Sequence, residues 1–144
     1  MSDPVDRTPE ALVRRYFDVC NERRLDDFDW LFPPTFVSHL RVGDVVGLPR
    51  FKELMRHVYD ALPDVLWTPI ETIYAPERAV VRYFFEGTHL GPFLGIPPSH
   101  RRVRVDACEV MVIKGGWVPE IWNYADLMGF AAQVNAVNPL ALQV

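Results

Sequence analysis

The chain has 144 residues, which is enough for one domain with a sizeable core and an internal pocket, so residues 1–144 are expected to form a single domain. Its 15 Lys and Arg against 19 Asp and Glu give a net charge of -4, and no basic run interleaves with aromatic residues, which argues against nucleic-acid binding. No apolar stretch approaches the ~20 residues of a membrane span, the N-terminus is unlike a signal peptide, and Cys20 and Cys108 lack metal-ligand spacing. We therefore expect a cytoplasmic protein with no membrane segment and no metal site.

Three helices are predicted in the first half of the chain. The first spans residues 9 to about 23, because Thr8 is a typical N-cap and a proline follows it at the first helical position, where a missing N–H costs nothing. Its apolar residues, Tyr16 among them, recur at the spacing of a core-facing helix. A short second helix begins at Leu25, and a third is expected over residues 48–62.

The second half of the chain is dominated by the period-2 alternation of β-strands. Strands are expected at residues 36–40, 65–74 and 79–89, and in a final hairpin whose two strands meet at the Gly115-Gly116 pair. Residues 43–47 are predicted as a loop and residues 127–137 as a final helix. Helices followed by an antiparallel meander predict an α+β domain. A curved antiparallel or mixed sheet wrapped around the N-terminal helices would be cone-shaped and enclose a deep apolar pocket, which favours a small hydrophobic ligand.

Glu109 is the informative exception in the predicted hairpin. Period 2 places it in an otherwise apolar row of Val105, Ala107, Met111 and Ile113. An ionised carboxylate in such a row is costly unless it is hydrogen-bonded, protonated or open to a wet cavity. On the other strand, Asn123 shares a face with Ile121. Both faces of the hairpin are largely apolar, which indicates that helices cover one face and a second subunit covers the other.

Several motifs in this frame resemble those of one known family. They are Phe36-Val37-Ser38-His39, Leu62-Pro63-Asp64, Gly87-Thr88-His89, Gly91-x-Phe93-x-Gly95-Ile96-Pro97-Pro98 and Glu120-x-Trp122. Together they resemble the SnoaL-like polyketide cyclases of the nuclear-transport-factor-2-like superfamily, over residues 9 to about 134. The resemblance implies an α+β cone with a deep pocket, a homodimer formed through the sheet, and neither metal nor organic cofactor. It also implies a role in natural-product (antibiotic) biosynthesis, since family members close rings on polyketides by intramolecular aldol chemistry.

Two positions depart from that aldol chemistry. In the aldol cyclases the general acid/base is an aspartate on the last strand, which aligns with Asn123, and its histidine partner aligns with Glu109. An amide cannot take a proton at neutral pH, so the family mechanism does not transfer directly.

Three functions therefore remain open. The favoured one is a cofactor-independent cyclase that folds a flexible polyketide or polyene in the apolar pocket for ring closure, including a pericyclic (4+2) closure that needs no titrating group. The second is an acid/base aldol cyclase or isomerase in which Glu109 abstracts a proton and Asn123 donates a hydrogen bond to the enolate, with Asp126 as the fallback base. The third is a non-catalytic small-molecule binding module.

Substrate contacts are expected from the inner faces of the cone. The predicted substrate-binding residues are Tyr16, His39, Trp67, Tyr83, Phe85, Met111 and Asp126, beside the predicted catalytic residues Glu109 and Asn123. A structural role is the alternative for Tyr16 as a core residue, for His39 as a satisfied histidine, and for Asp126 as the cap of the final helix. The loop over residues 90–100 is expected to border the pocket mouth, either as a lid or as a rigid crossover.

Overall fold

The computed structural model describes residues 6–138, and its elements follow the predicted order except for one additional strand before the third helix. The α-helices are α1 (Pro9–Glu22), α2 (Leu48–Ala61) and α3 (Leu127–Gln133), and a short 3-10 helix, η1 (Leu25–Trp30), follows α1. The strands are β1 (Val37–Leu40), β2 (Gly43–Val46), β3 (Leu66–Ala75), β4 (Arg78–Thr88), β5 (Arg102–Lys114) and β6 (Trp117–Ala125).

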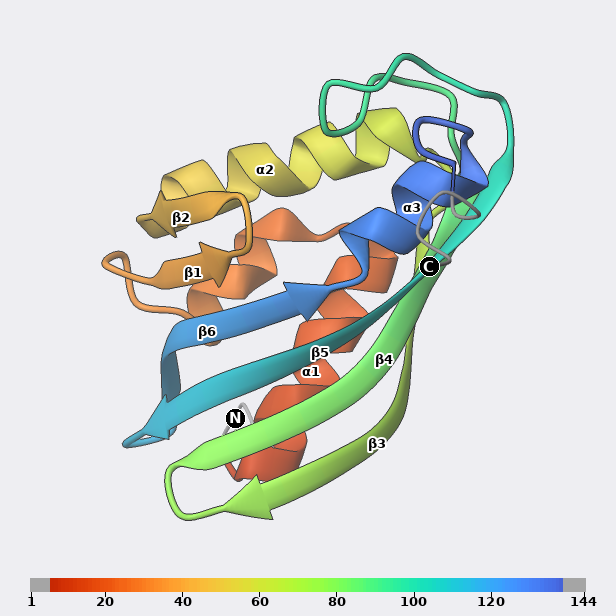
Figure 1. Ribbon diagram of the computed structural model, residues 1–144. Helices are drawn as coiled ribbons and strands as arrows, with labels where there is room; N and C mark the ends of the chain where they lie inside the picture. Colours follow the sequence, from red (N-terminus) through yellow and green to blue (C-terminus); the bar gives the residue numbers. More distant parts are fainter. Residues whose placement is uncertain (1–5, 139–144) are drawn as a thin grey trace.

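The strands form one curved sheet in the order β2-β1-β6-β5-β4-β3. Neighbouring strands are antiparallel except β1 and β6, which run parallel with Val37 beside Glu120. Figure 1 shows the long strands β3 to β5 bending around α1, with α2 lying across the β1–β2 end of the molecule. Helices packed against one face of a mixed sheet confirm the predicted α+β class.

Helix α1 begins and is buried as its sequence predicts. Thr8 Oγ1 accepts a hydrogen bond from Ala11 N (3.3 Å), and Arg23 ends the helix with a left-handed φ of 60°. One face of the helix is buried: Leu12, Val13, Tyr16, Phe17, Val19 and Cys20. The Asn21 amide then accepts from Trp67 N (2.8 Å) and donates to Trp67 O (2.9 Å). This two-way pairing fixes the end of α1 against β3.

Alternation along β4 and β5 decides which side chains face the helices. The predicted inner row of β5 is buried: Val105, Ala107, Glu109, Met111 and Ile113. The buried row of β4 is Ala79, Val81, Tyr83 and Phe85. The predicted turn between β5 and β6 is confirmed, and Gly115 and Gly116 both have positive φ (57° and 79°), as a two-residue hairpin loop of this kind requires. Glu109 therefore projects from the concave face of the sheet.

The loop predicted over residues 43–47 is wrong. Gly43–Val46 form β2, which pairs antiparallel with β1 through a two-residue turn at Arg41 and Val42. The strand is short, lies at the sheet edge and begins with a glycine of positive φ (136°), so it offers too little alternation to be recognised from sequence.

The final helix ends at Gln133, four residues before the predicted end at Val137. Asn135 takes a left-handed φ of 59°, and the backbone N–H groups of Asn135 and Ala136 bond back to helix carbonyls (3.2 and 2.8 Å). This is a Schellman termination, in which asparagine replaces the usual glycine.

The motif residues around Asp64 and Thr88 hold the end of α2 against β4. The Asp64 carboxylate accepts hydrogen bonds from Thr88 N (2.6 Å) and Thr88 Oγ1 (2.8 Å), which lower the pKa of Asp64. Gly87 leaves room for this contact, because a Cβ there would lie 3.0 Å from Asp64 Oδ1. His89 is buried, accepts at Nδ1 from Ser99 N (3.2 Å), and has its pKa lowered by that burial. The Gly-Thr-His segment is thus an architectural junction.

Replacing Gly91 with Ala is expected to destabilise this junction by about 1–3 kcal/mol, because an added Cβ would lie 2.7 Å from the Asp60 carbonyl oxygen. Gly95→Ala in the same loop is the matched control, since its Cβ meets no atom within 4 Å and only its positive φ (74°) opposes a side chain, at about 1 kcal/mol. Thermal unfolding of both variants checks this. A smaller loss for Gly91→Ala than for Gly95→Ala would contradict the steric argument.

Candidate active site

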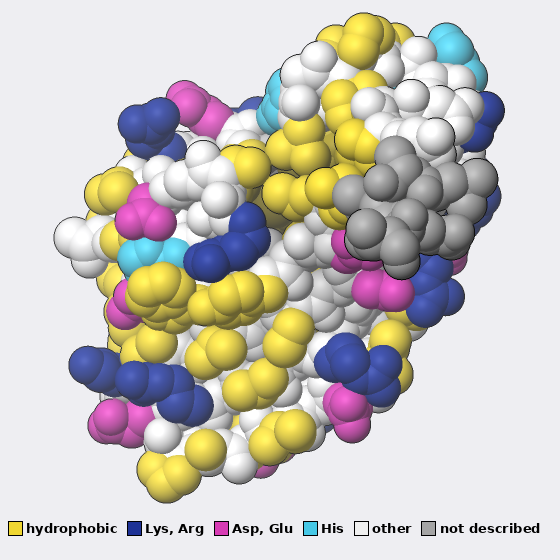
Figure 2. Space-filling view, in the orientation of Figure 1, with side chains coloured by type: hydrophobic (Ala, Val, Ile, Leu, Met, Phe, Trp, Pro, Cys, Tyr) yellow, Lys and Arg dark blue, Asp and Glu magenta, His cyan; other side chains and the backbone are white. Residues whose placement is uncertain are grey.

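An apolar cavity of about 150 Å³ lies between the concave face of the sheet and α2. Helix α2 closes it with Phe51, Leu54, Met55 and Val58, and the inner rows of β3 to β6 form the opposite wall. In Figure 2 the surface is hollowed between the β1–β2 hairpin and the loop after β4, and hydrophobic side chains rim the hollow. The predicted apolar pocket is therefore present, and its mouth lies beside the loop over residues 90–100, as expected.

Glu109 places a carboxylate in this apolar wall. Its Oε1 accepts three hydrogen bonds, from Tyr83 Oη (2.9 Å), Tyr16 Oη (3.1 Å) and Asn123 Nδ2 (3.1 Å). Asn123 Nδ2 also donates to Tyr83 Oη (2.9 Å), so the three donors form one network. The register of the β5–β6 hairpin creates this group, because it sets Glu109 directly opposite Asn123. Glu109 Oε2 is buried and has no hydrogen-bond partner within residues 6–138.

Burial raises the pKa of Glu109 to about 6, against the lowering effect of the hydrogen bonds from Tyr83, Asn123 and Tyr16. A carboxyl group with a pKa near neutrality can both take and return a proton. Because Oε1 already accepts three hydrogen bonds, the proton of the neutral acid resides on Oε2. The carboxyl group thus exchanges its proton through one defined atom.

The two phenols cannot serve as bases. Burial and the nearby Glu109 carboxylate raise the pKa of both Tyr16 and Tyr83 well above its ordinary value. Both hydroxyls therefore stay protonated and act as hydrogen-bond donors.

The structure brings most of the predicted site residues together. Tyr16, Trp67, Tyr83 and Phe85 all line the cavity, as do Glu109 and Asn123. Tyr16 and Tyr83 contact Glu109 directly, whereas Trp67 and Phe85 lie beside each other (ring centroids 6.1 Å apart) and form an aromatic wall.

His39 lies outside the cavity, contrary to its predicted substrate contact. On β1, Ser38 and Leu40 line the cavity, and alternation turns His39 to the opposite face of the sheet. There its Nδ1 bonds Asp44 Oδ1 (2.9 Å), its Nε2 bonds Glu120 Oε1 (2.6 Å), and its ring stacks on Trp122 (3.9 Å). His39 is thus a satisfied structural histidine that joins β1, β2 and β6.

His39→Gln is expected to cost up to about 1 kcal/mol of stability below pH ~6.5 and progressively less above it. Burial lowers the pKa of His39, but the hydrogen bonds with Asp44 and Glu120 outweigh it and the net pKa is raised. The contribution of a raised pKa is full below the unfolded value of ~6.5 and is lost as pH rises through the folded value. Urea unfolding of both proteins across this range checks the prediction; a pH-independent difference would contradict it.

Met111 and Asp126 also lie outside the cavity lining. Met111 shares the inner row with Glu109 but is completely buried in the core, beside Ile121 of β6. Asp126 caps α3, since its Oδ1 accepts from Gly129 N (2.8 Å). The structural alternative thus describes Asp126 better than a role as fallback base.

Sequence reasoning did not assign most of the remaining cavity residues to the site, among them Ser38, Arg41, Phe93 and Leu94. The alternation that set Ser38 opposite His39 was a usable signal for the serine. Phe93 and Leu94 belong to a tight turn closed by Phe93 N to Ile96 O (3.0 Å) and Ile96 N to Phe93 O (2.9 Å), in which Leu94 has a left-handed φ of 53°. Arg41 lies in the β1–β2 turn, between the strand predicted to end at Leu40 and the loop predicted to begin at Gly43, and no pattern marked it.

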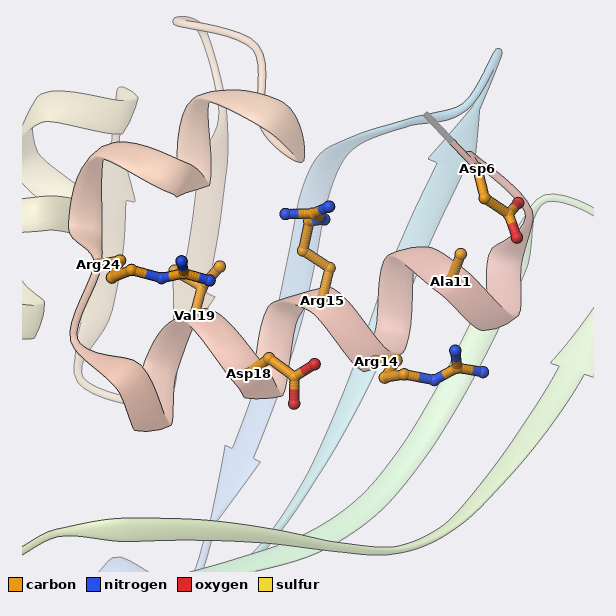
Figure 3. Close-up of a pocket in the computed structure, with 7 residues that line it drawn as sticks. All are labelled: Asp6, Ala11, Arg14, Arg15, Asp18, Val19 and Arg24. Atoms are coloured by element: carbon orange, nitrogen blue, oxygen red, sulfur yellow. The ribbon is translucent and has the colours of Figure 1, made fainter. Parts of the chain in front are cut away.

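A second hollow lies on the solvent side of α1, away from this network. It is lined by Arg14, Arg15 and Arg24 together with Asp6 and Asp18. Figure 3 shows Arg14 and Arg15 extending in different directions from α1 and Arg24 lying past the end of the helix, so the three guanidinium groups do not converge on one point. This groove lacks the geometry of a built site.

Within the part of the chain that the structure describes, no three His, Cys, Asp or Glu side chains gather in a way that could hold a metal ion. None of the helices formed by residues 6–138 is long and apolar enough to cross a membrane.

The curved mixed sheet around N-terminal helices, with a polar cluster at the base of an apolar cavity, is the architecture of the nuclear-transport-factor-2-like fold. The sequence profile of the SnoaL-like polyketide cyclases matches residues 10–134. The chain belongs to the SnoaL-like polyketide cyclase family.

Solved structures with the same fold support this assignment. TsrD from Streptomyces laurentii is 25% identical (TM-score 0.81; 89% of this chain and 95% of that chain covered). A SnoaL-like protein from Jannaschia sp. CCS1 is 22% identical (TM-score 0.82; 95% and 98% covered), and a SnoaL-like polyketide cyclase from Agrobacterium tumefaciens is 18% identical (TM-score 0.76; 87% and 96% covered). Among curated proteins, none matches this sequence.

Proposed function

We propose that the protein is a cofactor-independent enzyme that cyclises or isomerises a small polyketide-like carbonyl compound, with Glu109 as the group that moves the proton. The observation that carries this proposal is the unpartnered, buried Oε2 of a carboxyl group whose pKa is about 6. A titrating group of this kind in an apolar cavity is typical of acid/base catalysis. Membership of the polyketide cyclase family supports the substrate class.

In this mechanism the ionised carboxylate removes a proton from the carbon next to the substrate carbonyl. The C–H bond breaks, its electron pair delocalises into an enolate, and the proton rests on Glu109 Oε2. Negative charge has then left Glu109, so the donors Tyr16, Tyr83 and Asn123 become free to stabilise the enolate oxygen. The enolate carbon attacks a second carbonyl in the same molecule, or is reprotonated at another carbon in an isomerisation, and Glu109 returns the proton.

Shape-driven ring closure, including a pericyclic (4+2) closure, is the second candidate. The wall formed by α2 and by Phe93 and Leu94 carries only apolar side chains, and such a wall can hold one conformer of a polyene without any proton transfer. This mechanism does not require an ionised Glu109, so the two candidates differ in their dependence on pH and on that residue.

The proposal is tested by the exchange of the α-protons of indanone, a small aryl ketone, in heavy water. We expect the protein to accelerate exchange, with a rate that rises through about pH 6 as Glu109 ionises and is level above it. NMR loss of the α-proton signal measures the rate. Binding of indanone without acceleration at any pH would exclude proton abstraction and leave shape-driven closure or a binding module.

We further propose a homodimer formed through the convex face of the sheet. Trp122 is 37% exposed on β6, and Figure 2 shows further hydrophobic side chains spread over this face. Exposed apolar area of this kind is typical of interaction surfaces. Sedimentation should give twice the chain mass of 16.6 kDa, and Val110→Lys, at the centre of the face beside Trp122, should give monomers.

A further inference from the structure

We infer that the ligand of this cavity carries a free carboxylate, which Arg41 binds at the mouth while the apolar body of the ligand reaches toward Glu109. The inference rests on the proposed function in that it assigns a chemical class to the ligand of the same site. The starting observation is that Arg41 is the one cationic side chain among the residues that line the cavity.

Arg41 is held in place without being neutralised. Its guanidinium lies over the ring of Tyr124, 4.3 Å from the centroid, and within residues 6–138 it has neither an ion pair nor a hydrogen bond. A planar guanidinium stacked on an aromatic ring keeps its donors free for bidentate binding of a carboxylate.

The nearby acids are each engaged elsewhere. Asp44, on the same hairpin, accepts from His39 (2.9 Å). Asp106 accepts from Arg104 (3.3 Å), and Asp126 caps α3. Arg41 shares an open hollow with Asp106 and Asp126 but forms no ion pair with either within residues 6–138, so its donors remain open to a ligand.

The two ends of the cavity therefore have different chemistry. Glu109 and its donors lie in the sheet wall, whereas Arg41 lies in the turn between β1 and β2, at the rim. The space between them is apolar and, at about 150 Å³, has room for roughly one six-membered carbon ring. This combination fits a small unsaturated or aromatic acid better than a large fused polyketide or a neutral ester.

The test compares cinnamic acid with its methyl ester, which differ in charge but share one apolar body. We expect calorimetry to show the acid binding about tenfold more tightly than the ester at low salt, with the preference shrinking as salt is added. Arg41→Gln should remove most of this preference and leave ester binding unchanged, whereas Arg41→Lys should retain part of it. Arg50→Gln, which removes the same charge from an exposed position of α2, is the matched control and should behave like the native protein.

Equal binding of acid and ester would overturn the inference, as would an acid preference that survives Arg41→Gln, or the absence of binding of both probes in the millimolar range. Glu109→Gln should keep or increase the acid preference, because Arg41 is unchanged and the negative charge of Glu109 is removed. Failure of the proposed proton transfer would instead appear as absent indanone exchange with the acid preference intact, so the two failures are distinguishable.

Discussion

Replacing Glu109 with Gln is expected to slow α-proton exchange by about 100-fold or more. The amide oxygen can accept the same hydrogen bonds from Tyr16, Tyr83 and Asn123, so the network is kept. An amide nitrogen then takes the position of Oε2, however, and it cannot accept a proton at neutral pH. Indanone exchange above pH ~7, where native Glu109 is ionised, is the measurement.

The same substitution is expected to leave the protein at least as stable as the native chain above pH ~7. The folded pKa of Glu109, about 6, lies above its ordinary value of 4.5, so the native state binds more protons than the unfolded state between these values and loses stability as pH rises through them. Above about pH 6 this costs roughly 2 kcal/mol, which an uncharged glutamine does not incur. Lower activity combined with equal or higher stability would separate a catalytic role from a structural one.

Glu86→Gln is the matched control, because it removes a carboxylate from the outer row of β4 and leaves the cavity untouched. It should exchange indanone at the native rate. A loss below about tenfold in Glu109→Gln would exclude the role of general base and return shape-driven closure to first place.

Alternation along the strands made the central feature of this site predictable. A row with period 2 in β5 contains one charged residue, so its burial in the cavity wall could be inferred from Glu109 alone, and the Gly-Gly turn set the register that brings Asn123 opposite it. The same logic misplaced His39 in the site, because alternation gives two faces of a strand without saying which one the helices cover.

Contacts between distant segments were beyond sequence reasoning. The parallel pairing of β1 with β6 joins residues about 80 positions apart, and no local pattern specifies it. It is this pairing that places Ser38 in the cavity wall and lets the hairpin after β1 present Arg41 at the mouth. The donors on a single oxygen of Glu109 likewise come from α1, β4 and β6, and only their convergence reveals that the other oxygen is free.

Because these three donors converge on Glu109, we propose acid/base chemistry as the first candidate mechanism and shape-driven closure as the second. From sequence, the loss of the family aspartate favoured shape-driven closure. In the structure, Asn123 is a donor in a network around Glu109 and does not need to be a base itself. In the proposed mechanism, Glu109 has a partner set of phenols and an amide in place of the family's histidine, which supports acid/base chemistry from the adjacent strand.

Replacing Asn123 with Asp is expected to convert this network into a pair of carboxyl groups that share one proton. Asn123 Nδ2 now donates to Glu109 Oε1 (3.1 Å) and to Tyr83 Oη (2.9 Å); the substitution removes that donor and sets a second negative charge at the same distance. Two carboxylates this close cannot both ionise in a buried site, so one pKa of the pair rises strongly, by about 2 units or more. The pH midpoint of indanone exchange should move upward from about 6 by a similar amount.

The pH dependence of the free energy of unfolding should show the same rise in pKa, as a loss of stability with increasing pH. A raised folded pKa gives stability that is present below the unfolded value of ~4 and is lost as pH rises through the folded value, so Asn123→Asp should approach native stability in acid and fall behind it by about 2–3 kcal/mol near pH ~8. Asn123→Leu is the informative comparison, because it removes the same donor without adding charge and should show a smaller pH-dependent loss, which comes from Glu109 alone. A midpoint that stays near 6 in Asn123→Asp would mean that the two side chains do not interact, and would contradict the network from which the proton-transfer mechanism is argued.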